Sequence, residues 1–246
     1  MPAAPAMTVV PRSALAFDAD GPQRGYAHIG FDDYPADAPG HLRFDPLLLF
    51  GVGDMHPGEG FAMHHHEGIE NLLLVLEGGL RHSDAEGNAW VSGPGDLALM
   101  SAGSGGDHAE WVEGDRPVKA LVFWLRSDDG APCVYHRRNV ARALDGERWT
   151  LVASGDPSRA ADVMPLRTDA AIKLASLREG SRLEHHLPVG RRAYLMAVDG
   201  QFGVNGESVD DGARVLATGP QTLVLASGRA ASTRVILIDM PAPSLP

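Results

Sequence analysis

The chain has 246 residues, which suits one large or two small domains, and its 44% hydrophobic content is typical of a globular protein. Its formal net charge is −11 and no basic cluster offsets it, which argues against a surface for nucleic acid or anionic membranes. The single cysteine, Cys133, excludes an intrachain disulfide and favours a reducing compartment.

The beginning of the chain, Met1–Met7, lacks the basic start and apolar core of a secretory signal. No apolar run approaches the length that is needed to cross a bilayer. We therefore expect a soluble cytoplasmic protein that contacts neither nucleic acid nor a membrane.

Short apolar runs recur along the chain and are bounded by Gly, Pro, Asp and Asn, a pattern that is typical of strands in an all-β fold. The runs are Leu47–Phe50, Leu72–Leu76, Leu97–Met100, Ala120–Leu125, Leu195–Val198, Thr222–Leu225 and Val235–Ile238. The pair Asn205-Gly206 predicts a tight hairpin. Helical pattern is scarce, and we expect one short helix over Asn139–Leu144 with Asn139 as its cap.

Three consecutive histidines precede the second of these runs. If this stretch is extended, His64 and His66 point to one face and His65 to the other. Two imidazoles on one face before a buried strand suit a metal inside a β-barrel. A solvated histidine loop explains the same stretch equally well when it is taken alone.

A second candidate site follows the glycine-rich turn Ser101–Asp107, where alternation puts His108 and Glu110 on one face. This pair repeats the spacing of His64 and His66, so two adjacent strands could offer three imidazoles and one carboxylate to one point. Such a mixed nitrogen and oxygen set suits Fe(II), Mn, Ni, Co, Zn or Cu. We expect one divalent transition metal, and the ligand types do not choose among these ions.

The chain also contains an internal repeat, because Leu74–Gly78 resembles Met196–Gly200 and both precede a turn-rich hairpin. Two tandem copies of one domain explain this repeat. Aligning the repeats on their glycines pairs the candidate ligands with the following residues: His64 with His186, His66 with Pro188, His108 with Leu225 and Glu110 with Ser227. Only one ligand position keeps a ligand, so we expect a metal in the first copy and none in the second.

Together these residues resemble the pirin family. The resemblance rests on Gly60-Phe61-x-x-His64-x-His66-x-x-x-Glu70, Val75-Leu76-Glu77-Gly78, His82-x-Asp84, Pro94-Gly95-Asp96, Ser101-Ala102-Gly103 with His108-x-Glu110, and on Glu184-His185-x-Leu187 and Val204-Asn205-Gly206 in the second half. It implies a bicupin, that is, two tandem double-stranded β-helix (jelly-roll) domains. The expected domains are a metal-binding cupin over residues 1–140 and a metal-free cupin over residues 141–246.

By the same resemblance, His64, His66, His108 and Glu110 correspond to the family's metal ligands. Some pirin-like proteins cleave flavonols such as quercetin with O2, which implies a metal-dependent dioxygenase with Glu110 as ligand and catalytic base. A regulatory, non-enzymatic protein that binds a partner protein according to the metal's oxidation state would use the same ligands. A bicupin with another small-molecule reaction is a third reading.

Several neighbouring residues are predicted to have lesser roles. His65 stands where the family usually has proline and is expected not to bind the metal. Glu70 either orients a ligand imidazole or is a surface charge. His82 and Asp84 flank a hairpin and are expected to be turn residues. The segment Phe17–Leu49 is expected to decide whether the barrel mouth is open.

Overall fold

The computed structural model describes residues 5–18, 21, 23–29, 44–127, 129–228 and 232–242. Within these ranges the chain forms 22 strands, one α-helix and two 3-10 helices, so the predicted all-β class is confirmed. Contacts divide the chain into two compact units, which we call the N-terminal unit (Leu15–Ala141) and the C-terminal unit (Arg142–Pro246 together with Met1–Ala14). Residues 30–43, which belong to the segment expected over the barrel mouth, lie outside the described ranges.

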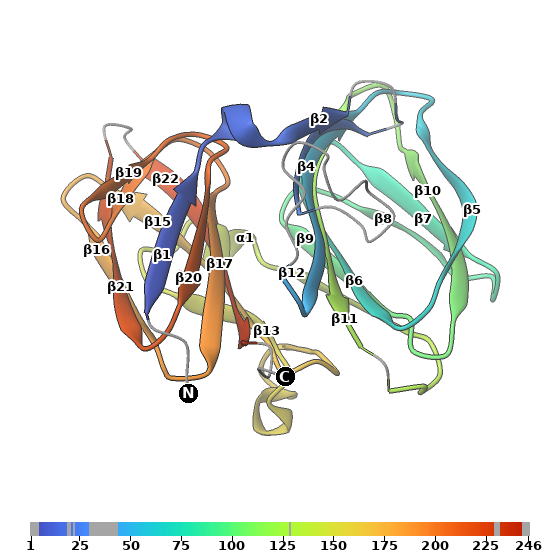
Figure 1. Ribbon diagram of the computed structural model, residues 1–246. Helices are drawn as coiled ribbons and strands as arrows, with labels where there is room; N and C mark the ends of the chain where they lie inside the picture. Colours follow the sequence, from blue (N-terminus) through green and yellow to red (C-terminus); the bar gives the residue numbers. More distant parts are fainter. Residues whose placement is uncertain are drawn as a thin grey trace. The chain divides into compact units, whose positions relative to one another are not determined.

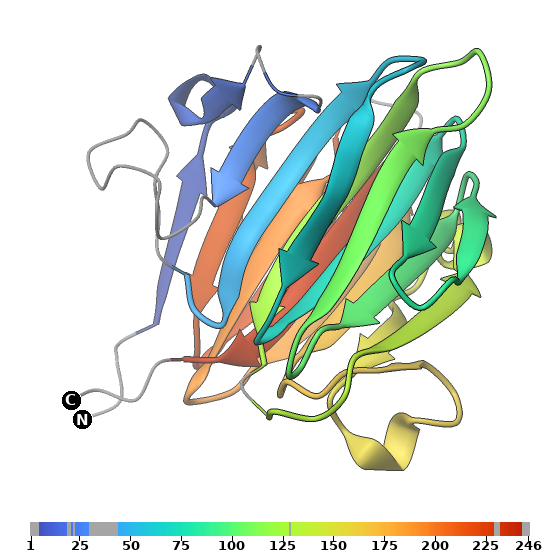
Figure 2. The same cartoon turned by 90° about the vertical axis from the view of Figure 1, so that its right-hand side faces the viewer.

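Two antiparallel sheets form the N-terminal unit (Figure 1). The larger sheet has the order β12 (Val134–Asn139), β9 (Asp96–Ser101), β6 (Ile69–Glu77), β11 (Val118–Arg126), β4 (Leu47–Met55), β3 (Arg24–Ile29) and β2 (Ala16–Asp18). The smaller sheet has the order β5 (Gly60–His66), β10 (Gly106–Val112), β7 (Leu80–Asp84) and β8 (Ala89–Ser92). In Figure 2 the long strands of this unit lie side by side.

Apolar side chains fill one end of the space between these two sheets. Their cluster consists of Met55, Leu73, Val75, Leu80, Val118 and Ala120, with Phe61 and Val112 packed against it. Burying side chains of this size contributes roughly 1.5–3 kcal/mol each. The strand β6 supplies much of this core and is buried from Ile69 to Leu76, which fits its place inside the sheet between β9 and β11. The interior also contains a group of histidines, which comprises His64, His66 and His108.

The C-terminal unit repeats this plan. Its larger sheet has the order β1 (Ala6–Val10), β20 (Arg214–Thr218), β17 (Arg191–Ala197), β22 (Ser232–Pro241), β15 (Ala171–Arg178), β13 (Thr150–Ser154) and β14 (Met164–Pro165). The smaller sheet has the order β16 (Arg182–Leu187), β21 (Gln221–Ser227), β18 (Phe202–Val204) and β19 (Glu207–Val209). The 3-10 helices Arg12–Ala14 and Pro157–Arg159 also belong to this unit.

The first strand departs from the expected domain division. We expected residues 1–140 to form one N-terminal domain, but β1 pairs antiparallel with β20 along its length, from Ala6 opposite Thr218 to Val10 opposite Arg214 (Figure 1). Met7 and Val9 pack against the core of the C-terminal unit, which explains why this strand lies there. The expectation is therefore wrong for the stretch that ends at Ala14.

The predicted local elements are present. Each apolar run lies in a strand, except that β17 ends one residue before Val198. The Asn205-Gly206 pair connects β18 to β19 with positive φ angles of 48° and 90°, as a tight hairpin turn requires. The helix α1 (Ala141–Leu144) is capped by Asn139, whose Oδ1 accepts a hydrogen bond from the Ala141 N–H at 3.2 Å. No helix in the described part of the chain is long and apolar enough to span a membrane.

Candidate metal centre

The strands β5 and β10 bring the predicted site residues together. Their antiparallel pairing puts His108 opposite His64, and Gly106 opposite His66. The register then shifts, so that Glu110 lies opposite Phe61. This bulge gives β5 one additional residue, and both Phe61 and His64 consequently line the interior although they are three residues apart.

Three imidazole rings converge in this interior. The ring centroids are 4.7 Å apart for His64 and His66, 4.5 Å for His64 and His108, and 5.0 Å for His66 and His108. His66 and His108 are buried, whereas His64 is half-buried. One ligand atom from each residue lies within 4.8 Å of the others, so the three could hold a metal ion.

The nitrogen positions fit a metal. His64 Nδ1 donates a hydrogen bond to the Ala62 carbonyl at 2.8 Å, which leaves the Nε2 lone pair of His64 directed at His66. The two Nε2 atoms are 3.0 Å apart. Two cis ligands at metal–nitrogen distances of about 2.1 Å are separated by about 3.0 Å, which matches this spacing. His108 Nε2 is buried without a hydrogen-bond partner in the described part of the chain, as expected for a nitrogen that binds a metal.

The electrostatics favour neutral imidazoles, the form that binds metals. Burial, together with the neighbouring His64 and His65, lowers the pKa of His66 to about 4. Burial and the adjacent histidines lower the pKa of His108 to about 2. Burial acts in the opposite sense on the carboxyl of Glu110 and raises its pKa to about 7. The site therefore keeps these two rings neutral, so their nitrogen lone pairs are available to a cation.

Glu110 does not belong to the group that the three histidines form. It forms a second group with His82 and His108, in which one ligand atom from each lies within 4.8 Å of the others. His108 thus belongs to both groups and connects the predicted pair His64 and His66 to Glu110. His82 was not predicted as part of the site. It lies opposite Glu110 in the pairing of β7 with β10, and Asp84 lies opposite His108.

A cavity of about 470 Å³ opens beside the three predicted residues that line it, His64, His66 and Glu110. This size is typical of small-molecule sites. Its walls are mainly apolar or aromatic, and they include Tyr26, Leu49, Phe50, Val52, Met55, Phe61, Leu73, Val122 and Trp124. Trp124 contacts the edge of the His66 ring at a centroid distance of 4.8 Å. Apolar walls with a few polar groups at one side suit a small, largely apolar ligand.

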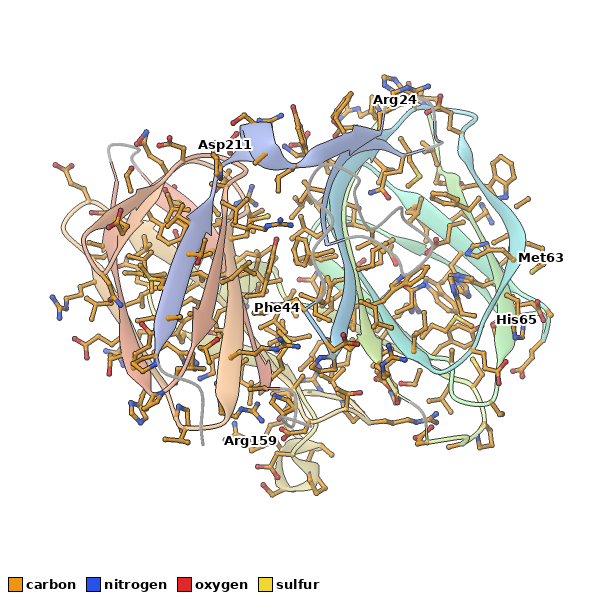
Figure 3. All side chains as sticks on the ribbon, in the orientation of Figure 1. Arg24, Phe44, Met63, His65, Arg159 and Asp211 are labelled. Atoms are coloured by element: carbon orange, nitrogen blue, oxygen red, sulfur yellow. The ribbon has the colours of Figure 1, made fainter. Side chains whose placement is uncertain are left out.

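The exposure of His65 and the burial of Glu70 decide two predictions about residues near the site. His65 is exposed on the outer side of β5, as is Met63, and pairs with Asp107 at 3.2 Å (Figure 3). It points away from the cavity, as strand alternation predicts. Glu70 is fully buried and accepts a hydrogen bond from the Ser101 hydroxyl at 3.1 Å, so the reading of Glu70 as a surface charge is wrong.

In the C-terminal unit, β16 and β21 occupy the places that β5 and β10 have in the N-terminal unit. The residue that turns inward there is His185, which is buried, whereas His186 is exposed. The glycine-based alignment of His64 with His186 was therefore wrong by one residue. His185 Nε2 lies 2.9 Å from Asp239, and Arg191 Nε donates to the same carboxylate at 2.7 Å.

This second interior holds an ion-pair network in place of an imidazole cluster. Lys173 Nζ lies 3.4 Å from His185 Nδ1, so a lysine ammonium faces the inward histidine. Burial raises the pKa of Asp239, but hydrogen bonds with His185 and Arg191 outweigh it, and the net shift is downward. Within the described ranges, groups of His, Cys, Asp and Glu that could hold a metal occur in the N-terminal unit alone.

Comparisons with known proteins agree with this architecture. Residues 40–125 match the family model described as Pirin, and residues 151–240 match the model described as Quercetinase C-terminal cupin domain. The two barrels are therefore tandem cupins. A pirin-like protein of Caulobacter vibrioides is 30% identical over 192 residues, which cover 76% of this chain and 81% of the relative.

Two matches from Escherichia coli, one by sequence and one by structure, extend the comparison. A quercetin 2,3-dioxygenase of strain O157:H7 is 24% identical over 177 residues, or 71% of this chain and 75% of the relative. The crystal structure of the bacterial pirin YhhW in complex with nickel(II) superposes with a TM-score of 0.86 at 22% identity, covering 97% of this chain and all of that one. At this identity the likeness concerns the fold, and the bound nickel is a property of that protein.

Proposed function

The chain belongs to the pirin family, and from this membership we propose that it is a metal-dependent dioxygenase that opens the ring of flavonols such as quercetin with O2. A single metal in the N-terminal cupin serves the reaction. Fe(II) is the first choice, and Mn, Ni, Co, Cu and Zn suit the same ligands. The observation that carries the proposal is the convergence of three largely enclosed imidazoles beside an apolar cavity of about 470 Å³.

The metal is held by His64, His66, His108 and Glu110. The histidines offer Nε2 lone pairs, since Nδ1 of His64 is engaged by a carbonyl and Nε2 of His108 is the unpaired atom. Glu110 joins them through its proximity to His108. A redox-active metal held by these residues would supply Lewis-acid and redox chemistry toward the flavonol and O2.

Glu110 is also the group that takes the proton of the flavonol hydroxyl. Burial raises the pKa of this carboxyl in the metal-free protein, which favours proton uptake, and a bound cation would act in the opposite direction. The apolar wall formed by Val52, Leu73 and Val122 receives the flavonol rings and excludes water from them. Both atoms of O2 enter the product in such a reaction, so no external reductant is needed.

The test is direct. Protein loaded anaerobically with Fe(II) is mixed with quercetin in air-saturated buffer, and the loss of flavonol absorbance is followed together with O2 uptake. We expect one O2 consumed for each flavonol. The variant His66→Ala should lose both metal and turnover while staying folded, because it removes one ligand from a barrel whose apolar cluster is elsewhere.

The outcome that contradicts the proposal is equally concrete. Protein that retains Fe, Mn, Co, Ni or Cu and consumes neither quercetin nor O2 with any of them is not a quercetin dioxygenase. That result would favour the regulatory alternative, in which the same ligands control the binding of a partner protein. Global unfolding of His66→Ala would instead identify the metal as structural.

A further inference from the structure

His82 occupies a position beside the metal centre that the reaction described above does not use. The residue is 7% exposed, and its Nδ1 atom lies 3.4 Å from Nδ1 of His108. The pairing of β7 with β10 puts Glu110 opposite His82, so that His108, two residues before Glu110, is the diagonal neighbour of His82 on the same face. His82 therefore faces the Nδ1 edge of the His108 ring.

Aromatic contacts fix the plane of the His82 ring. It stacks on Trp90 with centroids 3.7 Å apart and an interplanar angle of 15°, and Tyr135 packs edge-on at 5.0 Å. Arg137 in turn covers the Trp90 ring at 4.9 Å. A ring held by two aromatic partners has little rotational freedom, so its nitrogens keep their directions.

Asp84 lies on the Nε2 side of His82, at a separation longer than a hydrogen bond, and Nε2 of His82 has no hydrogen-bond partner in the described part of the chain. The Asp84 Oδ2 atom lies 3.8 Å from His82 Nε2 and is itself held by the Asn88 amide at 2.8 Å. The other carboxylate oxygen accepts hydrogen bonds from the backbone N–H groups of Glu86 and Asn88. A carboxylate fixed on this side favours the tautomer of His82 with hydrogen on Nε2, which leaves Nδ1 as an acceptor.

We propose that His82 is a positioning residue that accepts a hydrogen bond from Nδ1–H of His108 and so directs the Nε2 lone pair of His108 at the metal. Metal-binding histidines generally need such an acceptor behind them, and its loss typically lowers metal affinity 10- to 100-fold. His82 does not itself bind the metal. This inference rests on the metal site of the proposed function.

Two substitutions separate the hydrogen bond from the packing. His82→Phe keeps a flat ring between Trp90 and Tyr135 but removes the acceptor. His82→Asn loses the ring but places an amide oxygen close to the former Nδ1 position. Cobalt(II) is titrated into the metal-free full-length protein against a competing chelator, and the affinity and visible spectrum are recorded. The exposed His186→Phe serves as the matched control.

We expect His82→Phe to bind cobalt about 10- to 100-fold more weakly than the wild type, whereas His82→Asn stays within about threefold and His186→Phe is unchanged. In proton NMR of the cobalt protein, the hyperfine-shifted N–H signal of His108 should weaken in His82→Phe through faster solvent exchange. A purely packing role predicts the reverse order, with His82→Asn the weaker binder.

Three results would overturn the inference: wild-type affinity in His82→Phe, the reversed order of the two variants, or two cobalt ions per wild-type chain with one lost in His82→Phe. The last result would make His82 a ligand of a second ion. Tight cobalt binding by the wild type without any cleavage of quercetin refutes the proposed dioxygenase alone, and the ranking of the variants still decides the role of His82.

Discussion

Lowering the pH should destabilise the metal-free protein through its buried histidines. His66 and His82 have pKa values lowered to about 4, and that of His108 is lowered to about 2; burial is the main cause in each case. In the unfolded chain a histidine titrates near 6.5. Between these values the unfolded state binds more protons than the native state. Stability is therefore full at pH 7 and falls as the pH drops through about 6.5.

The magnitude follows from these values. Between pH 7 and pH 5, each of the three histidines removes about 2 kcal/mol of unfolding free energy, or about 5 to 6 kcal/mol together. Glu110 acts in the opposite direction, because its pKa of about 7 lies above the unfolded value and the native state gains a proton on acidification. That gain is worth about 2 kcal/mol, so a net loss of about 3 to 4 kcal/mol is expected for the wild type.

Urea unfolding of chelator-treated protein at pH 7 and pH 5, followed by tryptophan fluorescence, measures this loss. Two variants bracket the wild type. Glu110→Gln removes the compensating group and should lose about 5 to 6 kcal/mol, whereas His82→Phe removes one titrating ring and should lose about 2 kcal/mol. If Glu110→Gln loses no more stability than the wild type on acidification, the assignment of a raised pKa to Glu110 is refuted.

Three further predictions concern single residues. Cobalt binding at pH 6 should release about 0.9 proton more from the wild type than from Glu110→Gln. Calorimetry in buffers of different ionisation enthalpy measures this difference, and equal proton release would exclude Glu110 as a ligand. Val122→Trp should fill the cavity and lower kcat/KM for quercetin about 100-fold or more, with cobalt affinity unchanged; retained turnover would place the substrate elsewhere. Asp239→Asn removes the carboxylate that His185 and Arg191 share, while Arg191 keeps its ion pair with Asp169. It should lower the unfolding free energy in urea by about 1 to 3 kcal/mol, and an unchanged midpoint would contradict the network.

Strand alternation carried much of the prediction of the site. The repeated i, i+2 spacing of His64 with His66 and of His108 with Glu110 is enough to place each pair on one face, and short apolar runs between turn residues are enough for an all-β class. What alternation cannot reveal is a bulge. The additional residue between Phe61 and His64 has no signature in the sequence, yet it brings both side chains into the cavity.

Sequence reasoning missed three features for three different physical reasons. His82 and Asp84 read as turn residues because they precede the turn residues Ala85–Asn88, although the alternation of Leu80, His82 and Asp84 matches the buried positions of β7. His185 was displaced by an alignment on turn glycines, and a shift of one residue exchanges the two faces of a strand. The pairing of β1 with β20 joins segments about 200 residues apart, which no local pattern encodes.

The number of metal ions per chain tests the central claim most directly. Full-length protein is reconstituted with Fe(II) or Co(II), freed of excess metal by gel filtration, and analysed by mass spectrometry of the metal and by protein concentration. One ion per chain is expected, reduced to near zero in a folded His66→Ala. Two ions per chain, or none after careful reconstitution, would contradict a single centre built on His64, His66, His108 and Glu110.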